Sequence, residues 1–249
     1  RRLISLFYVA VWVLPIFGAQ VANFENDENV KSNQVLSRYK NNSVVFLKND
    51  SFFIAELDSR GKIVNAAYTT DFDRIQPEGQ FAYSEKSGEL YYVNGGKLFK
   101  AKQRKSGKWV NSAYIEVKGS EVKRDKYPGS VLAYANWRYL PKDSIVIVNP
   151  TINSQGDVLY FSSNMNNTKG KDIWEMSKDQ NGEWGNPVRM DASVNTVDAD
   201  EDFPFVNDEG MLVFASNRGN TSKSDSTYSL FSKSVPVDYE QYNKAKEER

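Results

Sequence analysis

Apolar residues beyond position 40 fall in short runs that alternate with clusters of Gly, Asn, Ser and charged residues. No long stretch repeats with the 3.6-residue period of a helix. Gly or Asn in such clusters takes the positive φ that tight strand reversals need. The pattern therefore predicts short antiparallel strands joined by hairpin turns, over 43–47, 52–57, 80–84, 90–93, 97–101, 109–117, 145–148, 158–162, 172–176, 211–215 and 228–232.

An internal repeat narrows the architecture further. The segment 149–164 returns as 203–217, with a turn glycine, a second strand and a closing Ser-Asn in both copies. The matched residues lie 53 or 54 positions apart, and they are Pro150, Asn153, Gly156, Phe161 and Asn164 in the first copy and Pro204, Asn207, Gly210, Phe214 and Asn217 in the second.

Weaker copies precede this pair. The turn and strand at 87–93 align with the repeat, and Trp109 matches Trp184 at an offset of 75. A degenerate unit covers 43–65. Each copy predicts an inner strand, a glycine turn, a second strand, a variable loop, a third strand and an outer strand marked by Trp. Such a unit is a small sheet that buries both faces only by stacking on its neighbours.

The period lies near the ~40–50 residues of a propeller blade. The predicted fold is all-β: a β-propeller of about four to five four-stranded blades, closed or incomplete. The repeat domain is expected over 41–235, with an irregular insertion at 119–148. A polar segment at 20–40 precedes it, and a charged tail at 236–249 follows it.

The N-terminus has the composition of a secretory signal peptide. Arg1 and Arg2 precede an uncharged apolar run that ends in small residues, which predicts a signal peptide over 1–19. The run contains Pro15 and is short for a membrane span of ~20 residues, although an uncleaved anchor is the alternative. Export without cysteine favours a bacterial envelope over a eukaryotic secretory route, with no stable membrane insertion of the mature chain.

Composition then removes several kinds of chemistry. The chain has 249 residues, 32 Lys and Arg against 32 Asp and Glu, and neither His nor Cys. A balanced charge argues against a basic nucleic-acid groove. Without His and Cys there is no Ser-His-Asp triad, no thiolate or histidine zinc site and no disulfide framework. The sequence indicates no cofactor, and any catalysis would rest on carboxylates, Lys, Tyr, Ser or Thr.

The repeat resembles a known family. The pattern Pro-x-x-Asn-x-x-Gly-x-x-Leu-Tyr-Phe-Ser-Ser-Asn from Pro150, followed by 172–174 and 182–187, resembles the TolB-type, WD-repeat-like β-propeller repeat of Bacteroidetes envelope proteins. The junction 194–204, with Asn-Thr, Asp-Glu and Pro, is similar to the link between successive blades there. The resemblance is good over 149–219 and moderate over 76–118. It implies a propeller used for binding, of a kind often found with OmpA-like peptidoglycan-binding domains. It also implies a location in the periplasm or at the outer membrane of a Gram-negative bacterium.

Two sets of carboxylates are candidates for chemistry. The acidic run Asp198, Asp200, Glu201 and Asp202 offers hard oxygen ligands for Ca²⁺, but it lacks the spacing of a calcium loop, so a solvated loop between blades is favoured and no metal ligand is assigned. Some propellers are glycosidases with paired carboxylates. Asp73, Glu78, Asp172 and Glu201 are candidates for that role, yet no spacing singles out a pair, so no catalytic residue is assigned.

Aromatic residues give the remaining candidates. Trp109 and Trp184 stand at equivalent points of the repeat, which favours a role in blade packing. Trp137, Arg138 and Tyr139 lie in the insertion and have no counterpart in the repeat, so they are the candidate interface, with a local core as the alternative.

The sequence therefore predicts a non-enzymatic scaffold for proteins or ligands in the bacterial envelope. Its expected partners are envelope proteins, peptidoglycan-associated or outer-membrane, and not nucleic acid. The alternative is a carboxylate-based, glycan-active enzyme on a propeller. A further alternative is a larger ring that a second copy of the chain completes.

Overall fold

The computed structural model describes residues 34–117, 145–165, 170–219 and 228–236. Strands dominate this part of the chain, and no helix within it is long and apolar enough to cross a membrane. The strands are β1 (Gln34–Tyr39), β2 (Ser43–Lys48), β3 (Ser51–Leu57), β4 (Ile63–Thr69), β5 (Ala82–Ser84), β6 (Glu89–Asn94), β7 (Lys97–Gln103), β8 (Trp109–Tyr114), β9 (Ile147–Ile152), β10 (Val158–Ser163), β11 (Asp172–Ser177), β12 (Val188–Arg189), β13 (Glu201–Val206), β14 (Met211–Ser216) and β15 (Ser229–Ser234).

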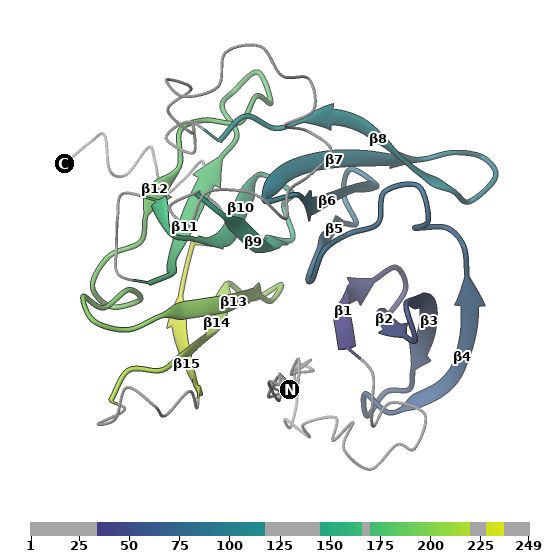
Figure 1. Ribbon diagram of the computed structural model, residues 1–249, viewed down its shortest axis with the longest axis horizontal. Coiled ribbons are helices and arrows are strands. Elements are labelled where there is room, and N and C mark those ends of the chain that lie inside the picture. The colour runs from purple at the N-terminus through teal and green to yellow at the C-terminus, as the bar shows by residue number, and fades with distance from the viewer. Residues whose placement is uncertain (1–33, 118–144, 166–169, 220–227, 237–249) are drawn as a thin grey trace, which may run out of the picture. The chain divides into compact units, whose positions relative to one another are not determined.

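Consecutive strands pair with one another in four antiparallel sheets (Figure 1). Blade 1 is β1–β4, blade 2 is β5–β8, blade 3 is β9–β12, and blade 4 is β13–β15, with three strands in the described residues. Strand order follows chain order in every sheet, which is the up-and-down meander of a propeller blade. The predicted fold class, an all-β propeller built from four-stranded blades, is confirmed, with four blades in this part of the chain.

The chain divides into two compact units, the first ending at Asp73 and the second beginning at Arg74. The first holds blade 1. Its core contains Val44, Phe46 and Ala55, and the ring of Phe46 stacks on that of Phe53 at 5.3 Å. The β2–β3 register places Val44 opposite Ala55 and Phe46 opposite Phe53, so these side chains share one face of the sheet.

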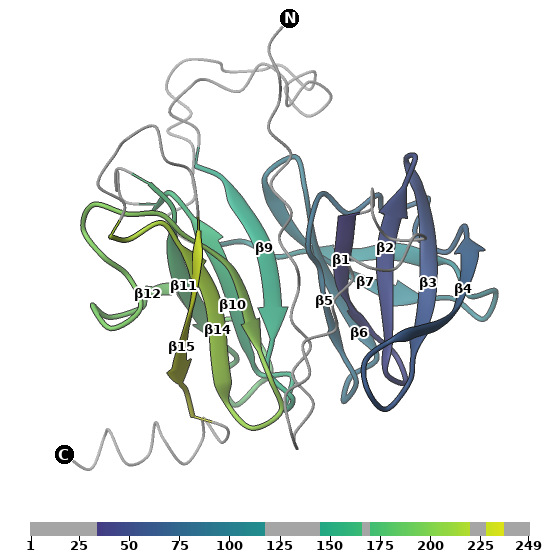
Figure 2. The same ribbon diagram turned by 90° about the horizontal axis from the view of Figure 1, so that it is seen from below.

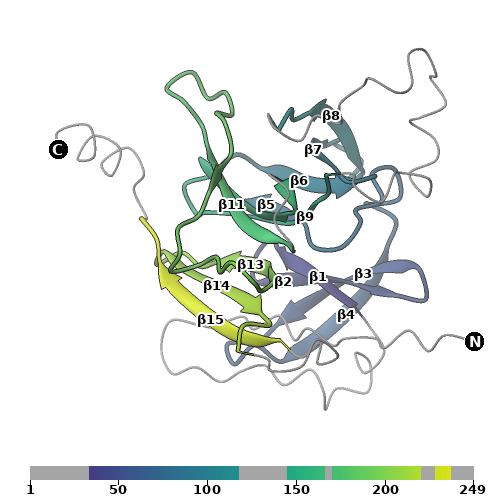
Figure 3. The same cartoon turned by 60° about the vertical axis from the view of Figure 1, so that its left-hand side comes forward.

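The second unit holds blades 2, 3 and 4, which stack face to face (Figures 2 and 3). One core lies between blades 2 and 3, where Tyr91, Val93 and Leu98 meet Leu159, Phe161, Trp174 and Met176. A second core lies between blades 3 and 4, where Val158, Tyr160 and Ile173 meet Leu212, Phe214 and Val206. The two faces of β10 thus carry different neighbours, because alternate residues of a strand point to opposite sides.

The repeated asparagines have definite structural roles. The side chain of Asn153 accepts hydrogen bonds from the backbone N–H groups of Asp157 and Val158, and Asn207 accepts them from those of Glu209 and Met211. Each Asn therefore closes the hairpin between the first and second strands of its blade. The fourth residue of each turn, Gly156 or Gly210, is a glycine in the left-handed region, with φ of 72° and 76° respectively.

The Ser-Asn that ends the second strand ties the blade to the incoming chain. Asn164 Oδ1 accepts a hydrogen bond from Val146 N at 2.7 Å, and Asn217 Oδ1 accepts one from Asp200 N at 2.8 Å. Both donors lie just before the first strand of the same blade. The asparagine at this position therefore fixes where the inner strand begins in both copies.

Two prolines lie at bulges in the inner strands. Asn149 before Pro150 and Phe203 before Pro204 have φ of 53° and 52°, and the pairing of β9 with β10 and of β13 with β14 shifts beside them. Proline lacks the N–H that a regular ladder needs, so it is found at bulges and strand edges. A residue before proline rarely takes this conformation, and the local contacts described below hold it.

Several boundaries differ from the sequence predictions. Strand β1 begins at Gln34, inside the segment expected to precede the repeat domain, and β9 begins at Ile147, inside the expected insertion. Strands β1, β4 and β12 were not among the predicted strands, and β13 was expected only as the inner strand of the second repeat copy. Strand β13 begins with acidic residues and contains Pro204, and β4 is mostly exposed, so neither shows the alternation of a half-buried strand. The predicted signal peptide, the tail from 237 and Trp137, Arg138 and Tyr139 lie outside the described residues.

Candidate interaction face

The connections of blades 2 to 4 differ between the two ends of the strands. In a meander, the turns that join strands one to two and three to four lie at one end, and the other connections lie at the opposite end. The first end carries tight turns at 85–88, 104–108, 153–157 and 207–210, and it also carries the connection 178–187, in which a tight turn at 179–183 is closed by a bridge between Lys178 and Trp184. The opposite end carries the connections 115–146, 164–171, 190–200 and 217–228, and only the Gly95-Gly96 turn there is short. We call this opposite end the long-connection end.

The inner strands of the second unit are tied together by one side chain. Gln80 precedes β5, and its Nε2 donates to Pro204 O at 2.7 Å and to Pro150 O at 3.4 Å. The two acceptors are the bulge prolines of blades 4 and 3. A residue of blade 2 therefore satisfies carbonyl groups that the bulges remove from the sheet ladders.

Asp202 also bonds both bulges. It is 1% exposed, and its Oδ1 accepts hydrogen bonds from Asn149 Nδ2 at 2.9 Å and from Phe203 N at 2.8 Å. Its Oδ2 pairs with the ammonium of Lys171, from the connection between β10 and β11. One buried carboxylate thus fixes both residues that have positive φ before proline.

Glu201 is the most densely bonded carboxylate of this region. It is fully buried and accepts hydrogen bonds from Thr196 N (3.0 Å), Thr196 Oγ1 (2.9 Å), Ser216 Oγ (2.7 Å) and Arg218 Nη2 (3.1 Å). Arg218 Nη2 also donates to Val194 O. Its guanidinium lies 4.4 Å from the ring centre of Phe231, so the cation also covers an aromatic face.

Two more sets of hydrogen bonds hold the connection 190–200, which leads from blade 3 to blade 4, and the residues beside it. Asp172 and Arg189 form a two-bond ion pair at 2.8 and 2.9 Å, and the hydrogen bond to Asp172 raises the pKa of Arg189. Asn195 Nδ2 donates to Ile173 O at 2.8 Å, and Asn195 Oδ1 accepts from Ile173 N at 2.7 Å. The side-chain amide of Asn195 therefore bonds the backbone of β11 at Ile173 as a further strand would.

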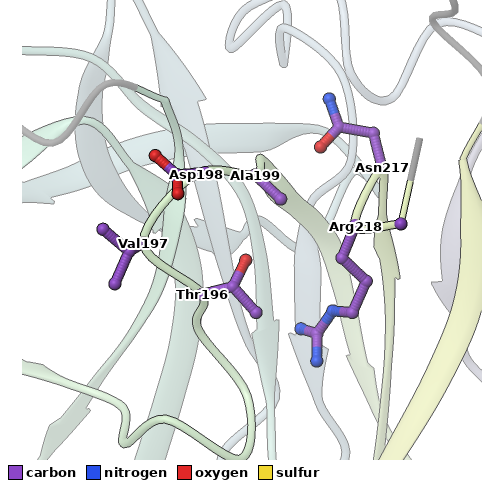
Figure 4. A pocket seen from close by; sticks show the side chains of 7 residues that line it. Thr196, Val197, Asp198, Ala199, Asn217 and Arg218 are labelled. Carbon is purple, nitrogen blue, oxygen red and sulfur yellow. The ribbon is translucent and has the colours of Figure 1, made fainter. Parts of the chain in front are cut away.

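An open pocket of about 270 Å³ lies at the long-connection end (Figure 4). Thr196, Val197, Asp198 and Ala199 line one side, and Asn217, Arg218 and Gly219 line the other. Val197 is 85% exposed, and it lies in a connection, whereas the other large hydrophobic residues exposed among the described ones lie in outer or third strands. An exposed apolar side chain beside a pocket on an ordered frame is suited to contact with a partner.

The acidic run does not converge on one point. Asp200 Oδ1 accepts from Lys171 N at 2.7 Å, while Glu201 and Asp202 bind the separate partners given above. Asp198 is exposed. Among residues 34–117, 145–165, 170–219 and 228–236, no group of three carboxylates is placed to hold a metal ion. These carboxylates serve the junction between blades.

Three of the four carboxylates considered for catalysis have partners within the second unit. Glu201 and Asp172 are buried in ion pairs with Arg218 and Arg189. Glu78 Oε2 accepts a hydrogen bond from Gly95 N at 2.9 Å, and Asp73 lies in the other unit. The carboxylates of Glu201, Asp172 and Glu78 are therefore already bound to partners within the fold.

Trp109 and Trp184 pair with equivalent positions at or just after the end of the neighbouring third strand, but they differ in how far they are buried. Trp109 pairs with Gln103 and is fully buried, whereas Trp184 forms an isolated bridge with Lys178 and is half-buried. Trp184 meets the ring of Tyr91 edge-on at 5.6 Å, and the Lys178 ammonium lies 4.9 Å from its ring centre. Trp184 therefore contributes to the contact between blades 2 and 3.

Sequence reasoning did not identify Gln80, Lys171, Val197 or Arg218. Gln80 and Lys171 lie outside the repeated motif, and Arg218 follows it at a position where the first copy has Met165. Their roles depend on which chain segments the stack brings together, and that information is not local to any of them.

No protein-family model and no curated protein matches the sequence. Among solved structures, a protein from Lactobacillus plantarum is similar at 11% identity and a TM-score of 0.39, over 82% of this chain and 55% of that one. TolB from Acinetobacter baumannii is similar at 14% identity and a TM-score of 0.35, over 82% and 38%. Prolyl oligopeptidase B from Galerina marginata is similar at 10% identity and a TM-score of 0.32, over 78% and 24%. This chain thus spans about half or less of those proteins, and the assignment of the fold rests on its own strand order.

Proposed function

We propose that the protein is a non-enzymatic binding scaffold and that it contacts its partner through the long-connection end of blades 2 to 4. The observation that carries this proposal is the asymmetry of the connections. Tight, self-bonded turns occupy one end, and the long connections, the pocket and Val197 occupy the other. Binding residues gather on connections that a rigid frame holds in place.

The frame itself is well suited to this task. Gln80 joins blades 2, 3 and 4 through amide–carbonyl hydrogen bonds, and Asp202 and Glu201 add charge-assisted ones, so the connections begin and end at fixed points. The connection between β8 and β9 leaves the described residues at Val117 and returns at Ile145, at the same end. It carries Trp137, Arg138 and Tyr139, residue types that are enriched at the centres of interfaces.

We further propose that the scaffold works in the envelope of a Gram-negative bacterium. The support is the basic and apolar composition of residues 1–19 and the absence of cysteine. The partner class that follows is an envelope protein or a peptidoglycan-associated component. Fractionation of cells that express the tagged chain tests the location: recovery in the periplasmic or outer-membrane fraction supports it, and recovery in the cytosol contradicts it.

Binding is tested with a matched pair of surface variants. Val197→Lys changes the long-connection end, and Val188→Lys changes an outer-strand valine that is 57% exposed. Immobilised protein is challenged with solubilised envelope proteins and with purified peptidoglycan sacculi. We expect a component retained by the unchanged chain and by Val188→Lys, and at least tenfold less of it on Val197→Lys. Equal retention by both variants would place the contact elsewhere.

A further inference from the structure

The outer half of blade 2 concentrates positive charge. The chain as a whole has as many carboxylates as cations, yet six cations and no Asp or Glu stand between Glu89 and Glu116. They are Lys97, Lys100, Lys102, Arg104, Lys105 and Lys108. A local excess of one sign in a neutral chain gives this blade a surface that attracts anions.

Two of these lysines lie on the face of blade 2 that meets blade 3. In the register of β6 with β7, Lys100 lies opposite Tyr91 and Lys102 lies opposite Glu89. Tyr91 and Val93 belong to the core between blades 2 and 3. Alternate residues of a strand share a face, and so do residues directly opposite one another. Lys100, Lys102 and Glu89 therefore lie at the seam between these two blades.

Blade 3 and the β5–β6 turn bring two more lysines to this seam. Lys178 follows β11, and its Nζ donates to Gly156 O at 2.9 Å and to Tyr91 OH at 3.3 Å. Lys86 Nζ donates to Gln155 Oε1 at 3.3 Å, in the same turn as Gly156. Both ammonium groups are thus held where tight turns of blades 2 and 3 meet. We call the four residues Lys86, Lys100, Lys102 and Lys178 the lysine cluster.

The carboxylates that act on the lysine cluster leave it with excess positive charge. Glu89 Oε1 lies 3.2 Å from Lys100 Nζ and 4.0 Å from Lys102 Nζ, and Glu89 Oε2 accepts a hydrogen bond from Tyr91 OH at 2.9 Å. The charge of Asp157 acts on Lys178, while its Oδ1 accepts a hydrogen bond from Asn153 Nδ2. Among these groups four ammonium groups face two carboxylates, an excess of two positive charges.

Two carboxylates that neighbour the cluster in sequence have other roles. Asp179 Oδ1 accepts hydrogen bonds from the backbone N–H groups of Asn181 and Glu183, at 2.9 Å each, within its own turn. The charge of Glu85 acts on Tyr83, whose ring meets that of Trp109. Tyr83 lies opposite Leu90, on the other face of blade 2 from Tyr91.

Lys178 shows the effect of the excess charge. Burial lowers its pKa, the charges of Lys100 and Lys86 lower it further, and those of Glu89 and Asp157 raise it. An anion bound among the ammonium groups would reduce their mutual repulsion.

We propose that the lysine cluster is a binding site for a phosphate group, either free or as an ester. Charge supports this choice, because a phosphate ester carries about −1.5 to −2 at pH 7, whereas a carboxylate or chloride carries one negative charge. Lysine ammonium groups bind phosphate oxygens as compact point charges. The site lies at the end of blades 2 and 3 that carries the tight turns, so it is separate from the long-connection end.

Calorimetric titration with inorganic phosphate tests the site, at an ionic strength held constant with sodium chloride. The test variant combines Lys86→Gln with Lys102→Gln, both exposed, which removes two charges and leaves Lys178 with its partners. The control combines Arg60→Gln with Lys62→Gln, both exposed in a hairpin of the first unit, and changes the net charge equally. We expect the unchanged chain and the control to bind phosphate, and the test variant to bind at least tenfold more weakly.

Equal phosphate affinities of the test variant and the control, or no binding by the unchanged chain, would overturn the proposal. Co-sedimentation with phosphatidylcholine vesicles that contain phosphatidic acid then identifies the source of the phosphate. Retention that the test variant loses and the control keeps would assign the site to a phosphate ester at a membrane surface. Binding of inorganic phosphate without retention on these vesicles would assign it to a soluble phosphate.

Discussion

Gln80 Nε2 lies 2.7 Å from Pro204 O, across 124 positions of sequence. The same nitrogen lies 3.4 Å from Pro150 O. Both carbonyls belong to bulges in inner strands, so this amide joins blades 2, 3 and 4 at the point where the regular ladders are interrupted. Two of the long connections, 115–146 and 190–200, lead directly into the inner strands that this contact joins.

Gln80→Ala should therefore destabilise the second unit. The side chain is partly buried, and its loss leaves two carbonyl groups without their donor, at a cost of about 1–2 kcal/mol. Urea unfolding measured by tryptophan fluorescence checks the value. Gln155→Ala, at an exposed turn residue, is the control and should stay within about 0.5 kcal/mol. Equal unfolding midpoints for the two variants would show that the contact of Gln80 with the two proline carbonyls contributes nothing to stability.

Glu201→Gln should be among the most damaging single substitutions. A neutral amide cannot accept all four hydrogen bonds that the carboxylate accepts, and Arg218 is left partly buried without its counter-ion. Breaking such a pair costs about 3–5 kcal/mol. Thermal unfolding of this variant is compared with that of Glu183→Gln, at an exposed turn residue, which should unfold at nearly the unchanged temperature.

A double-mutant cycle separates the pair from its surroundings. If Glu201 and Arg218 stabilise the junction jointly, Glu201→Gln combined with Arg218→Met should cost less than the two single changes added together. Strict additivity would mean that the two side chains act independently, contrary to the contact between them.

Gly156→Ala should cost more than Gly182→Ala. Both glycines have positive φ, 72° and 80°, so each alanine is strained by about 1 kcal/mol. A Cβ on Gly156 would also lie 2.6 Å from Ser84 Oγ of blade 2, whereas a Cβ on Gly182 meets nothing within 4 Å. The difference, about 1 kcal/mol or more, measures how tightly blades 2 and 3 pack. Equal unfolding midpoints in urea would contradict this packing.

Stability should fall in alkaline solution because of buried tyrosines. Burial raises the pKa of Tyr92 to about 12, and burial together with the charge of Glu89 raises the pKa of Tyr91 further. The unfolded chain releases these protons near pH 10 and the folded chain does so only at higher pH. The stability that the protonated hydroxyls of Tyr91 and Tyr92 contribute to the folded state is thus fully present below about pH 10. It is lost as the pH rises through their folded-state pKa values.

Tyr92→Phe tests the alkaline effect on one group. It removes the ionisable hydroxyl and keeps the ring that stacks on Phe99 at 5.5 Å. The pH midpoint of alkaline unfolding, followed by circular dichroism, should move upward, with little change in stability at pH 7. A midpoint that stays in place would mean that Tyr92 ionises alike in both states.

Local pattern and repeat were sufficient to predict the blades. The spacing of Asn153, Gly156 and Phe161 from their second copies reflects hairpin closure and core packing, which are properties of a single blade. The inner strands were harder to predict, because Pro150 and Pro204 interrupt the alternation of apolar and polar residues on which strand prediction depends. The roles of Gln80 and Arg218 were not predictable, since each acts on residues that only the stacking of blades brings near.

The central claim, that the long-connection end is the binding face, is tested most directly by photo-cross-linking in living cells. A photoreactive phenylalanine analogue replaces Val197 at the long-connection end, or Asn181 in an exposed turn at the end that carries the tight turns. The account predicts a discrete cross-linked adduct of one mass from position 197 and none from position 181. Adducts from position 181 alone, or equal adducts from both positions, would contradict it.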